Sequence, residues 1–438
     1  MSASITSPAE KAVDLLLVGA SGFTGKLVAK HIAENYPGTF RLGLCGRNPT
    51  KLQEVVDMMT TVGGKDFSTT KIYLADALNR TEIDAAVREA RVVISTAGPF
   101  WRYSRYLVAS CAQQGVHYLD ITGEPQYVVH NINHHAASAR ASGAKIISMC
   151  GVDSIPSDLA TYRMVSWLRE QKATPGAVTG IFDGMGGFSG GTVATGVTMF
   201  DDFPLSELRK LSDPYYMAPE TPTAQRKEWR ARGDVDVHKP TALLPLHKST
   251  DSQKKRWLAP WIMGPINAKV VRRTRSLLPD LYGPNFRYRE GMVGPWWVAA
   301  IMSLLPPLTA FLGLTGLLKR LVKWGVLPAP GQGPSEEMQT KKGWYRIDIE
   351  AEAVDKDGNQ RVATCSGGDK HRDPGYWGTS RLVLEAALCL VLDADRVAED
   401  PRLPQEGGVF TPAYALGEVL VKRLGGAKII FDTPRWVE

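Results

Sequence analysis

The chain has 438 residues, enough for two or three domains, and its 44% hydrophobic and 22% charged residues exclude an intrinsically disordered protein. Its formal net charge of +7 favours phosphate-bearing ligands or anionic surfaces but identifies neither. The five scattered cysteines form no C-x-x-C pair, so we predict free buried thiols, with neither a metal site nor a disulfide scaffold. The polar stretch Met1–Lys11 lacks the features of a signal peptide, and we expect a cytoplasmic protein.

The first predicted unit is a strand, a glycine-rich turn and a helix. The continuous apolar run Val13–Val18 is typical of a strand buried on both faces of a parallel sheet. Gly19, Gly22 and Gly25 follow at intervals of three residues, and Lys26–Asn35 has helical apolar spacing. Glycines at such a turn let the main chain approach a pyrophosphate, which the N-terminus of the helix then binds. The pattern therefore predicts a dinucleotide-binding loop.

The second predicted strand, Phe40–Asn48, ends beside a cation. Sites that prefer NAD usually place Asp or Glu here to bind the ribose 2′-hydroxyl group. In this chain Arg47 stands near the strand end, and Lys51 follows one helical turn later. Because a cation accommodates a 2′-phosphate, we predict NADP(H) as the cofactor; the alternative is an exposed arginine without that role.

Four more strand-like runs follow, each separated from the next by a helix-length segment. Asp76 ends the first of them, where it could face the adenine, and the small-residue turn Ala97, Gly98 and Pro99 could contact the cofactor through its backbone. This alternation predicts an α/β chain with an N-terminal Rossmann-type doubly wound parallel sheet, whose ligands bind at the carboxyl ends of the strands. The runs are Lys71–Leu78, Arg91–Phe100, Val116–Pro125 and Ala144–Asp158.

Hydride transfer to a carbonyl, imine or enoyl group also needs a proton donor near the nicotinamide. Polar side chains at the predicted strand ends are the candidates, and we favour Glu124 and Asp153. Each has a structural alternative, because Glu124 could orient a turn and Asp153 could cap the helix near Pro156. The other candidates are Tyr103, Asp120, Thr122 and Ser154.

The middle of the chain changes pattern. Ala177–Phe200 begins like a strand and becomes a glycine loop that enters a helix, with a cap near Ser189 or Thr192. This segment could cover the nicotinamide or serve as a structural crossover. Gly343–Gly367 alternates polar and apolar residues around Asp357-Gly358, which predicts a β-hairpin in a second, α+β domain.

Residues 226–289 are strongly basic, with fifteen Lys and Arg against five Asp and Glu. No nucleic-acid-binding motif accompanies these cations, so we expect no nucleic acid partner. We expect the cations either to attract anionic lipid headgroups or an acidic substrate, or to form a solvated basic face.

The next segment, Gly291–Leu318, contains no charged residue and is long enough to cross a bilayer, although Pro306-Pro307 would break a straight helix. Tryptophans and cations, which favour a membrane interface, stand at both ends. Three alternatives remain open: contact of residues 291–324 with a membrane or lipid-droplet surface, a buried hairpin or homodimer interface, and a full span. The flanking residues are Trp296, Trp297, Lys319, Arg320, Lys323 and Trp324.

Seven short motifs resemble those of the saccharopine dehydrogenase-like oxidoreductases, a family that includes the trans-acting enoyl reductases. The motifs are GASGFTG (19–25), AGPF (97–100), DITGEP (120–125), GVDSIPSDL (151–159), SGGT (189–192), VVRRT (270–274) and GGVFTPA (407–413). The resemblance implies a second cofactor-contacting turn at Ala97, Gly98 and Pro99, and a dinucleotide loop made of Gly19, Ser21, Gly22, Phe23, Thr24 and Gly25. It also implies a Rossmann domain over 1–160, an α+β domain over 161–400, and a C-terminal helix and strand over 401–438 that pack back near the first domain.

These observations predict an NADP(H)-dependent oxidoreductase that acts on a small hydrophobic or lipid-like substrate. The resemblance favours reduction of a C=C bond, and reduction of C=O or C=N stays open. Two other functions remain: an NADP(H)-binding protein of lipid surfaces without catalysis, and saccharopine dehydrogenase itself, whose full set of substrate-clamping residues is not recognised in this sequence.

Overall fold

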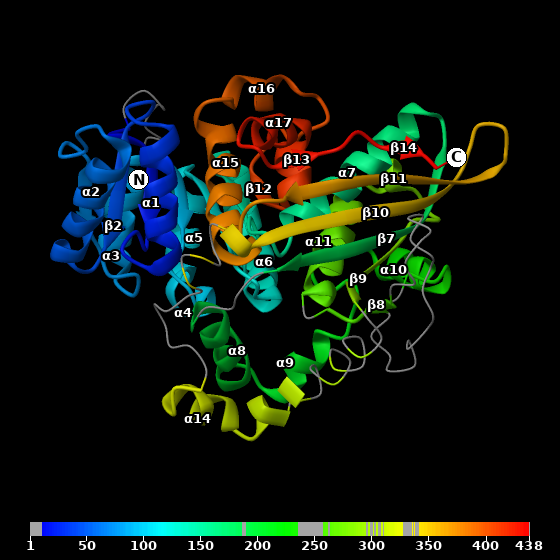
Figure 1. Cartoon of the computed structure of the whole chain (residues 1–438), viewed down its shortest axis with the longest axis horizontal. Coiled ribbons are helices and arrows are strands. Elements are labelled where there is room, and N and C mark those ends of the chain that lie inside the picture. The colour runs from blue at the N-terminus through cyan, green and yellow to red at the C-terminus, as the bar shows by residue number, and fades with distance from the viewer. Residues whose placement is uncertain are drawn as a thin grey trace.

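Two seven-stranded β-sheets stand side by side in the structure, a computed structural model (Figure 1). Helices cover both faces of the first sheet, and α7 and α11 pack on the second. The structure describes residues 11–185, 190–234, 257–261, 263–294, 297, 301, 304, 308–309, 311–326, 335, 337 and 341–437.

The first sheet is parallel, with strand order β12-β6-β5-β4-β1-β2-β3. This confirms the predicted doubly wound α/β fold, and each of the first six strands overlaps a predicted run. The seventh strand comes from the C-terminal part of the chain. The strands are β1 Val13–Val18, β2 Leu42–Gly46, β3 Lys71–Leu74, β4 Ala90–Ser95, β5 His117–Asp120, β6 Lys145–Ile147 and β12 Gly408–Phe410.

Helices follow these strands in alternation, and β1 shows how both faces become buried. Leu15 and Leu17 pack into the core that holds α1 and α2, whereas Leu16 and Val18 pack into the core that holds α3, α5 and α6. Successive side chains of a strand point to opposite faces, so a strand covered on both sides must be apolar throughout. The helices are α1 Phe23–Asn35, α2 Pro49–Gly63, α3 Arg80–Arg88, α4 Phe100–Tyr103, α5 Arg105–Gln114, α6 Pro125–Ser142 and α7 Ile155–Glu170.

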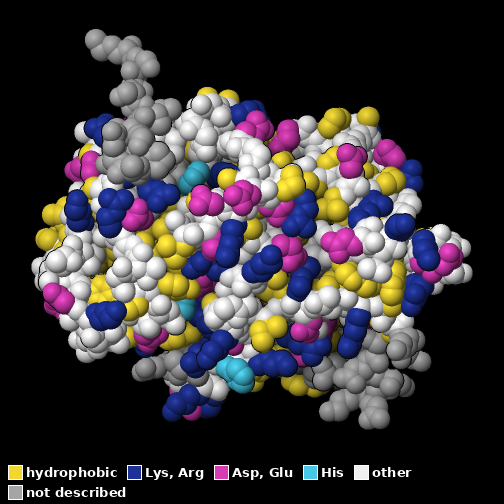
Figure 2. Space-filling model, turned by 90° about the horizontal axis from the view of Figure 1, so that it is seen from above, with side chains coloured by type: hydrophobic (Ala, Val, Ile, Leu, Met, Phe, Trp, Pro, Cys, Tyr) yellow, Lys and Arg dark blue, Asp and Glu magenta, His cyan; other side chains and the backbone are white. Residues whose placement is uncertain are grey.

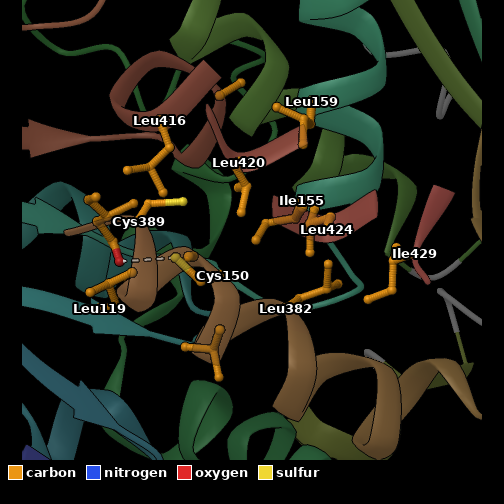
Figure 3. Close-up of a cluster of buried hydrophobic side chains, with 14 of the residues drawn as sticks. Leu119, Cys150, Ile155, Leu159, Leu382, Cys389, Leu416, Leu420, Leu424 and Ile429 are labelled. Carbon is orange, nitrogen blue, oxygen red and sulfur yellow. Dashed lines mark hydrogen bonds between the residues drawn. The ribbon is translucent and has the colours of Figure 1, made fainter. Parts of the chain in front are cut away.

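The C-terminal helices α15 (Thr379–Val391) and α17 (Pro412–Gly426) complete the core against the first sheet. Figure 3 shows Cys389 of α15 and Leu416 of α17 on the side of Leu119 of β5, and Leu382 of α15 near Leu424 of α17 in the same hydrophobic cluster. All five cysteines are buried and free, as predicted. The domain boundaries 1–160, 161–400 and 401–438 stay a prediction.

The second sheet has the order β13-β11-β10-β7-β9-β8, with β14 also paired to β11. The pair β7–β9 is parallel and the other pairs are antiparallel. The predicted hairpin is confirmed, since β10 and β11 pair around Gly358, whose φ of +86° suits glycine. The strands are β7 Thr174–Met185, β8 Trp257–Ala259, β9 Arg287–Gly294, β10 Trp344–Val354, β11 Gln360–Asp369, β13 Ile430–Phe431 and β14 Arg435–Trp436.

The remaining helices connect the sheets, and α8, α9 and α14 lie below them in Figure 1. Within the described part of the chain, no helix combines the length and apolar character that crossing a bilayer requires. The predicted cap position Ser189 lies outside the described residues. The helices are α8 Gly190–Asp202, α9 Leu205–Lys210, α10 Thr223–Ala231, α11 Gly264–Leu277, α12 Pro279–Tyr282, α14 Leu317–Lys323, the π-helical turn η3 Pro374–Gly378, and α16 Ala394–Glu399.

Three motifs that are far apart in the sequence meet at one buried carboxyl group. Asp158 of α7 accepts hydrogen bonds from the Thr274 hydroxyl of α11 at 2.5 Å and from the backbone N–H of Ala413 in α17 at 2.9 Å. The hydroxyl groups of Thr274 and Thr411 lie 2.6 Å apart. Burial raises the pKa of Asp158 to about 7. This cluster ties three helices together beside the two sheets.

Part of the basic region 226–289 is internal, which corrects the expectation that its cations lie on the surface. Arg272, Arg273 and Arg275 of α11 are at most 2% exposed. Asp234 accepts from Arg272 Nε at 3.0 Å and from Arg275 Nη1 at 2.7 Å, and the Tyr215 hydroxyl donates to it as well. Buried cations need a partner of opposite charge, so these arginines are unavailable to lipid or substrate. The cations of the same region between residues 235 and 256 lie outside the described residues.

Replacing Asp234 by Asn should lower the free energy of unfolding by about 3 to 5 kcal/mol, because Arg272 and Arg275 would stay buried without a counter-charge. Chemical denaturation measures the change. The control is Glu228→Ala, which removes the partner of Arg232 in a pair with side chains 45% and 53% exposed. That loss should stay below about 0.5 kcal/mol. Equal losses in the two variants would contradict the structural role given to Asp234.

Candidate functional site

In the glycine loop after β1, the backbone of α1 approaches the backbone at the end of β1 very closely. Gly19 has a φ of +80°, and a Cβ there would lie 2.9 Å from Thr96 Oγ1. A Cβ on Gly25 would lie 2.2 Å from the Gly19 carbonyl oxygen and 2.8 Å from Ala20 Cα. All three distances are shorter than a side chain tolerates, so the first turn of α1 packs directly on the loop only because Gly19 and Gly25 are glycine.

The N-terminus of α1 is open to a ligand. Gly22 is the N-cap residue, it is exposed, and no side chain of the described residues caps the turn that follows. The first amides of a helix lack partners within the helix, and the helix dipole favours an anion beside them. These groups suit the pyrophosphate of a dinucleotide. Ser21, Phe23 and Thr24 are half-buried around the same turn.

A segment from the far end of the chain closes on this loop. The ring of Tyr376 in η3 packs edge-on against Phe23, with ring centroids 5.2 Å apart. The Lys30 ammonium of α1 lies 5.1 Å from the centre of the Trp377 ring. Sequence reasoning missed both aromatic residues of η3, and the available signal was their position inside the glycine-flanked run Gly375–Gly378.

The end of β2 places a cation beside the glycine loop. The backbone N–H of Gly19 donates to the carbonyl oxygen of Cys45 at 3.0 Å, and Arg47 follows two residues later. Arg47 is exposed and forms no ion pair with any described residue. The Lys51 amide donates to the Asn48 side chain at 3.0 Å. An unpaired guanidinium at this point fits the 2′-phosphate of NADP(H).

The end of β3 lies further along the same edge of the sheet. The Asp76 carboxylate accepts a hydrogen bond from the backbone N–H of Leu78 at 2.9 Å, and its own N–H donates to Glu82 at 2.7 Å. These bonds fix a turn at the strand end. Contact of Asp76 with the adenine stays a prediction.

The turn after β4 is held by Glu124, which the sequence suggested as a proton donor. Its Oε1 accepts from the Phe100 amide at 2.9 Å and its Oε2 from the Trp101 amide at 2.8 Å, so it caps α4 directly after Ala97, Gly98 and Pro99. The Thr195 hydroxyl of α8 donates to Oε1 at 3.3 Å. Burial raises the pKa of Glu124. The geometry matches the alternative in which Glu124 orients a turn.

Asp120, at the end of β5, is also occupied by local hydrogen bonds. It is fully buried and accepts from the Thr122 amide at 3.1 Å, the Met149 amide at 3.1 Å and the Ser148 hydroxyl at 3.0 Å. Burial raises its pKa to about 6. The carboxylate therefore joins the loops that follow β5 and β6.

Asp153 differs from both, because its side chain is exposed to solvent. It stands between β6 and α7, where burial among surrounding protein and the charges of Glu290 and Asp373 raise its pKa to about 6. The carboxylate is therefore open to a ligand, while the surrounding protein and the two neighbouring carboxylates favour its protonated form. Ser154 next to it is buried, with its hydroxyl 3.4 Å from Asn267 Oδ1. Tyr103, the third catalytic candidate, ends α4 and is half-buried.

Glu290 lies on β9 of the second sheet and Asp373 is the N-cap residue of η3, and sequence reasoning found neither. Glu290 accepts hydrogen bonds from Trp261 Nε1, Asn267 Nδ2 and the Tyr288 hydroxyl, each at 2.7 Å. Trp261 stacks on Phe182 with centroids 4.2 Å apart. Two carboxylates from distant parts of the chain therefore act on Asp153, and aromatic rings lie beside one of them, Glu290.

The segment η3 connects the two parts of the site. Its Tyr376 touches the glycine loop, and Thr379, directly after it, accepts at its hydroxyl from the Val152 amide at 3.1 Å. The structure thus gathers the loop, Arg47, the Ala97–Pro99 turn and Asp153 at the carboxyl ends of β1, β2, β4 and β6. Ligands of open α/β sheets bind at this edge.

Comparison with known proteins agrees with this arrangement. Residues 15–147 match the sequence model of the saccharopine dehydrogenase NADP-binding domain. A Mycobacterium tuberculosis protein with the provisional name trans-acting enoyl reductase is 35% identical over 433 residues, which are 96% of this chain and 97% of that protein. The trans-acting enoyl reductase of Mycobacterium leprae is 32% identical over 447 residues, 98% of this chain and 99% of its own.

One solved structure shares the whole fold. Apo saccharopine dehydrogenase (L-Glu forming) from Saccharomyces cerevisiae aligns with 97% of this chain and 100% of its own, with a TM-score of 0.50 and 14% identity. The glycine loop and the matched domain define an NADP(H)-dependent oxidoreductase, as predicted. The chain belongs to the saccharopine dehydrogenase-like oxidoreductase family, which includes the trans-acting enoyl reductases.

Replacing Gly25 by Ala should weaken NADPH binding by roughly tenfold or more, because the new methyl group forces α1 away from the loop. Fluorescence titration with NADPH measures the dissociation constant. Gly425→Ala is the matched control, since a Cβ at that glycine meets no atom within 4 Å. Normal NADPH affinity in the Gly25 variant would refute the close-approach role of this residue.

Proposed function

We propose that the chain reduces the C=C bond of an enoyl group on a hydrophobic, lipid-like substrate, with NADPH as the reductant and Asp153 as the proton donor. The main support for this proposal is that the carboxylate of Asp153 is accessible to a ligand. The carboxylates of Glu124 and Asp120, by contrast, accept hydrogen bonds from backbone amides. The names of the relatives support the enoyl group as the target. Reduction of C=O or C=N needs the same donor and stays the next alternative.

The chain's own residues would orient the cofactor. Bound NADPH supplies the hydride. The amides after Gly22 face the pyrophosphate in this proposal, and Arg47 binds the 2′-phosphate. The turn Ala97–Pro99, fixed by the Glu124 cap, approaches the nicotinamide end from β4.

Asp153 would complete the reduction by giving its proton to the carbon next to the activating carbonyl group, after hydride reaches the other alkene carbon. A carboxyl group with a pKa near 6 is protonated often enough to act as an acid close to neutral pH. The neighbouring carboxylates of Glu290 and Asp373 favour its protonated form through their charge. The stacked rings of Phe182 and Trp261 beside Glu290 support an apolar substrate.

Replacing Arg47 by Asp should raise the dissociation constant of NADP(H) by roughly ten- to a hundredfold and leave NAD(H) binding equal or stronger, because a carboxylate repels the 2′-phosphate. Isothermal titration calorimetry with both cofactors measures this. Lys65→Asp makes the same charge change at an exposed residue after α2 and should not alter the preference. If both variants changed the NADP(H) dissociation constant equally, the effect would come from net charge alone, and Arg47 would have no specific role at the 2′-phosphate.

Replacing Asp153 by Asn should lower kcat by roughly a hundred- to ten-thousandfold while NADPH affinity is kept. In the wild-type protein the protonated acid is the active form, so kcat should fall as pH rises through about 6. This pH dependence should vanish in the variant. The rate of NADPH oxidation with an α,β-unsaturated fatty aldehyde and with an α,β-unsaturated acyl thioester provides the measurement.

The comparison variant is Glu124→Gln. If it loses the pH dependence and Asp153→Asn keeps it, the donor is Glu124 instead. Tight NADPH binding without turnover of enoyl, carbonyl or imine substrates would favour the non-catalytic alternative. Oxidation of saccharopine would favour saccharopine dehydrogenase.

A further inference from the structure

Six large hydrophobic side chains face solvent along one short segment. Their exposed fractions run from 50% to 68%, and the backbone is helical at each of them. Before Pro306-Pro307 the described members recur at spacings of four and three residues, and after it they recur at spacings of three and three, as on one face of a helix in each part. These residues, here called the apolar stripe, are Trp297, Ile301, Leu304, Leu308, Phe311 and Leu314.

The same spacing usually marks the side of a helix that turns toward the core. Here the inner side is taken by α8, since a Cβ on Gly313 would lie 2.2 Å from the Phe200 ring. The side chains of the apolar stripe therefore point toward solvent. On the face of the molecule seen in Figure 2, by contrast, hydrophobic side chains are interspersed with basic and acidic ones. Large contiguous apolar patches on a surface mark sites of interaction.

Basic and aromatic side chains border the stripe on α14. Lys319, Arg320 and Lys323 are exposed, and Trp324 after them is 64% exposed. Lys319 pairs with Asp201 at 2.7 Å. Arg320 and Lys323 have no ion pair among the residues that the structure describes. Two cations thus remain available next to the apolar side chains.

We propose that the apolar stripe and α14 dock on a phospholipid surface that carries anionic headgroups. The stripe enters the boundary between headgroups and acyl chains, Trp297 and Trp324 lie at headgroup level, and Arg320 and Lys323 contact phosphates. A second copy of the chain fits this surface less well. A two-fold contact through the stripe would gather the unpaired cations of both copies, and residues 291–318 contain no acidic residue to balance them.

Flotation of the purified full-length protein with phosphatidylcholine vesicles, with and without phosphatidylserine, tests the proposal. The wild-type protein should float with both and more strongly with the anionic vesicles. Leu304→Glu combined with Phe311→Glu should weaken binding by on the order of a hundredfold, since each buried side chain contributes about tenfold or more. Ile430→Glu with Val354→Glu is the control, because these residues are 60% and 40% exposed on other elements.

A second pair of variants tests the charges. Arg320→Gln with Lys323→Gln should lower affinity for anionic vesicles by roughly tenfold or more and remove the preference over neutral ones. Lys65→Gln with Lys356→Gln removes two exposed cations elsewhere and should change little.

NADPH titration and thermal denaturation confirm that each variant is folded, and both readouts are independent of the proposed reaction. Failure of the wild-type protein to float overturns the proposal, as does unchanged flotation of the Leu304 and Phe311 variant. A third outcome would assign the stripe to contact between two copies of the chain. In that case the wild-type protein would not bind vesicles and would sediment as a dimer, and the Leu304 and Phe311 variant would sediment as a monomer.

Discussion

The contact between the Gly25 backbone and the Gly19 carbonyl group is the constraint on which the site depends. A Cβ on Gly25 has no room there, so α1 meets the end of β1 through bare main chain. That approach aims the free amides of α1 at the edge where Arg47 follows β2 and the Ala97–Pro99 turn follows β4. Parallel strands share this edge, so fixing the first unit fixes the relation of all later strand ends to the helix N-terminus.

The C-terminal half of the chain also helps to build the proposed cofactor site. β12 extends the first sheet, α15 covers it, and η3 brings Tyr376 against Phe23. Buried residues of both sheets belong to one hydrophobic cluster. Loosening the second sheet should therefore disturb the dinucleotide loop, because the two parts have no separate cores at this point. Such shared construction explains why the two carboxylates near Asp153, Glu290 and Asp373, come from distant parts of the chain.

Local features of this fold could be predicted from the sequence, whereas pairings over long separations could not. The strand β1, its glycines, Arg47 and the Gly358 hairpin follow from short patterns and turn chemistry. Arg272 and Arg275 read as surface cations because burying charge is costly, and nothing local indicates that Asp234, about forty residues away, offsets the cost. The helical spacing of Trp297 to Phe311 likewise predicts an apolar face without saying whether that face turns inward.

Three carboxylates at neighbouring strand ends have different roles because of their surroundings. Asp120 and Glu124 are buried and saturated by amides, so they hold the loops that shape the site. Asp153 keeps an accessible carboxyl group, which is what a proton donor requires. Glu124 is also the point where α8 touches the site, through Thr195, and Asp202 of the same helix binds Arg102 of α4 at 2.7 and 2.6 Å. Phe200 of α8 lies against Gly313, between Phe311 and Leu314 of the apolar stripe, so this one helix connects the exposed stripe to the turn that Glu124 holds.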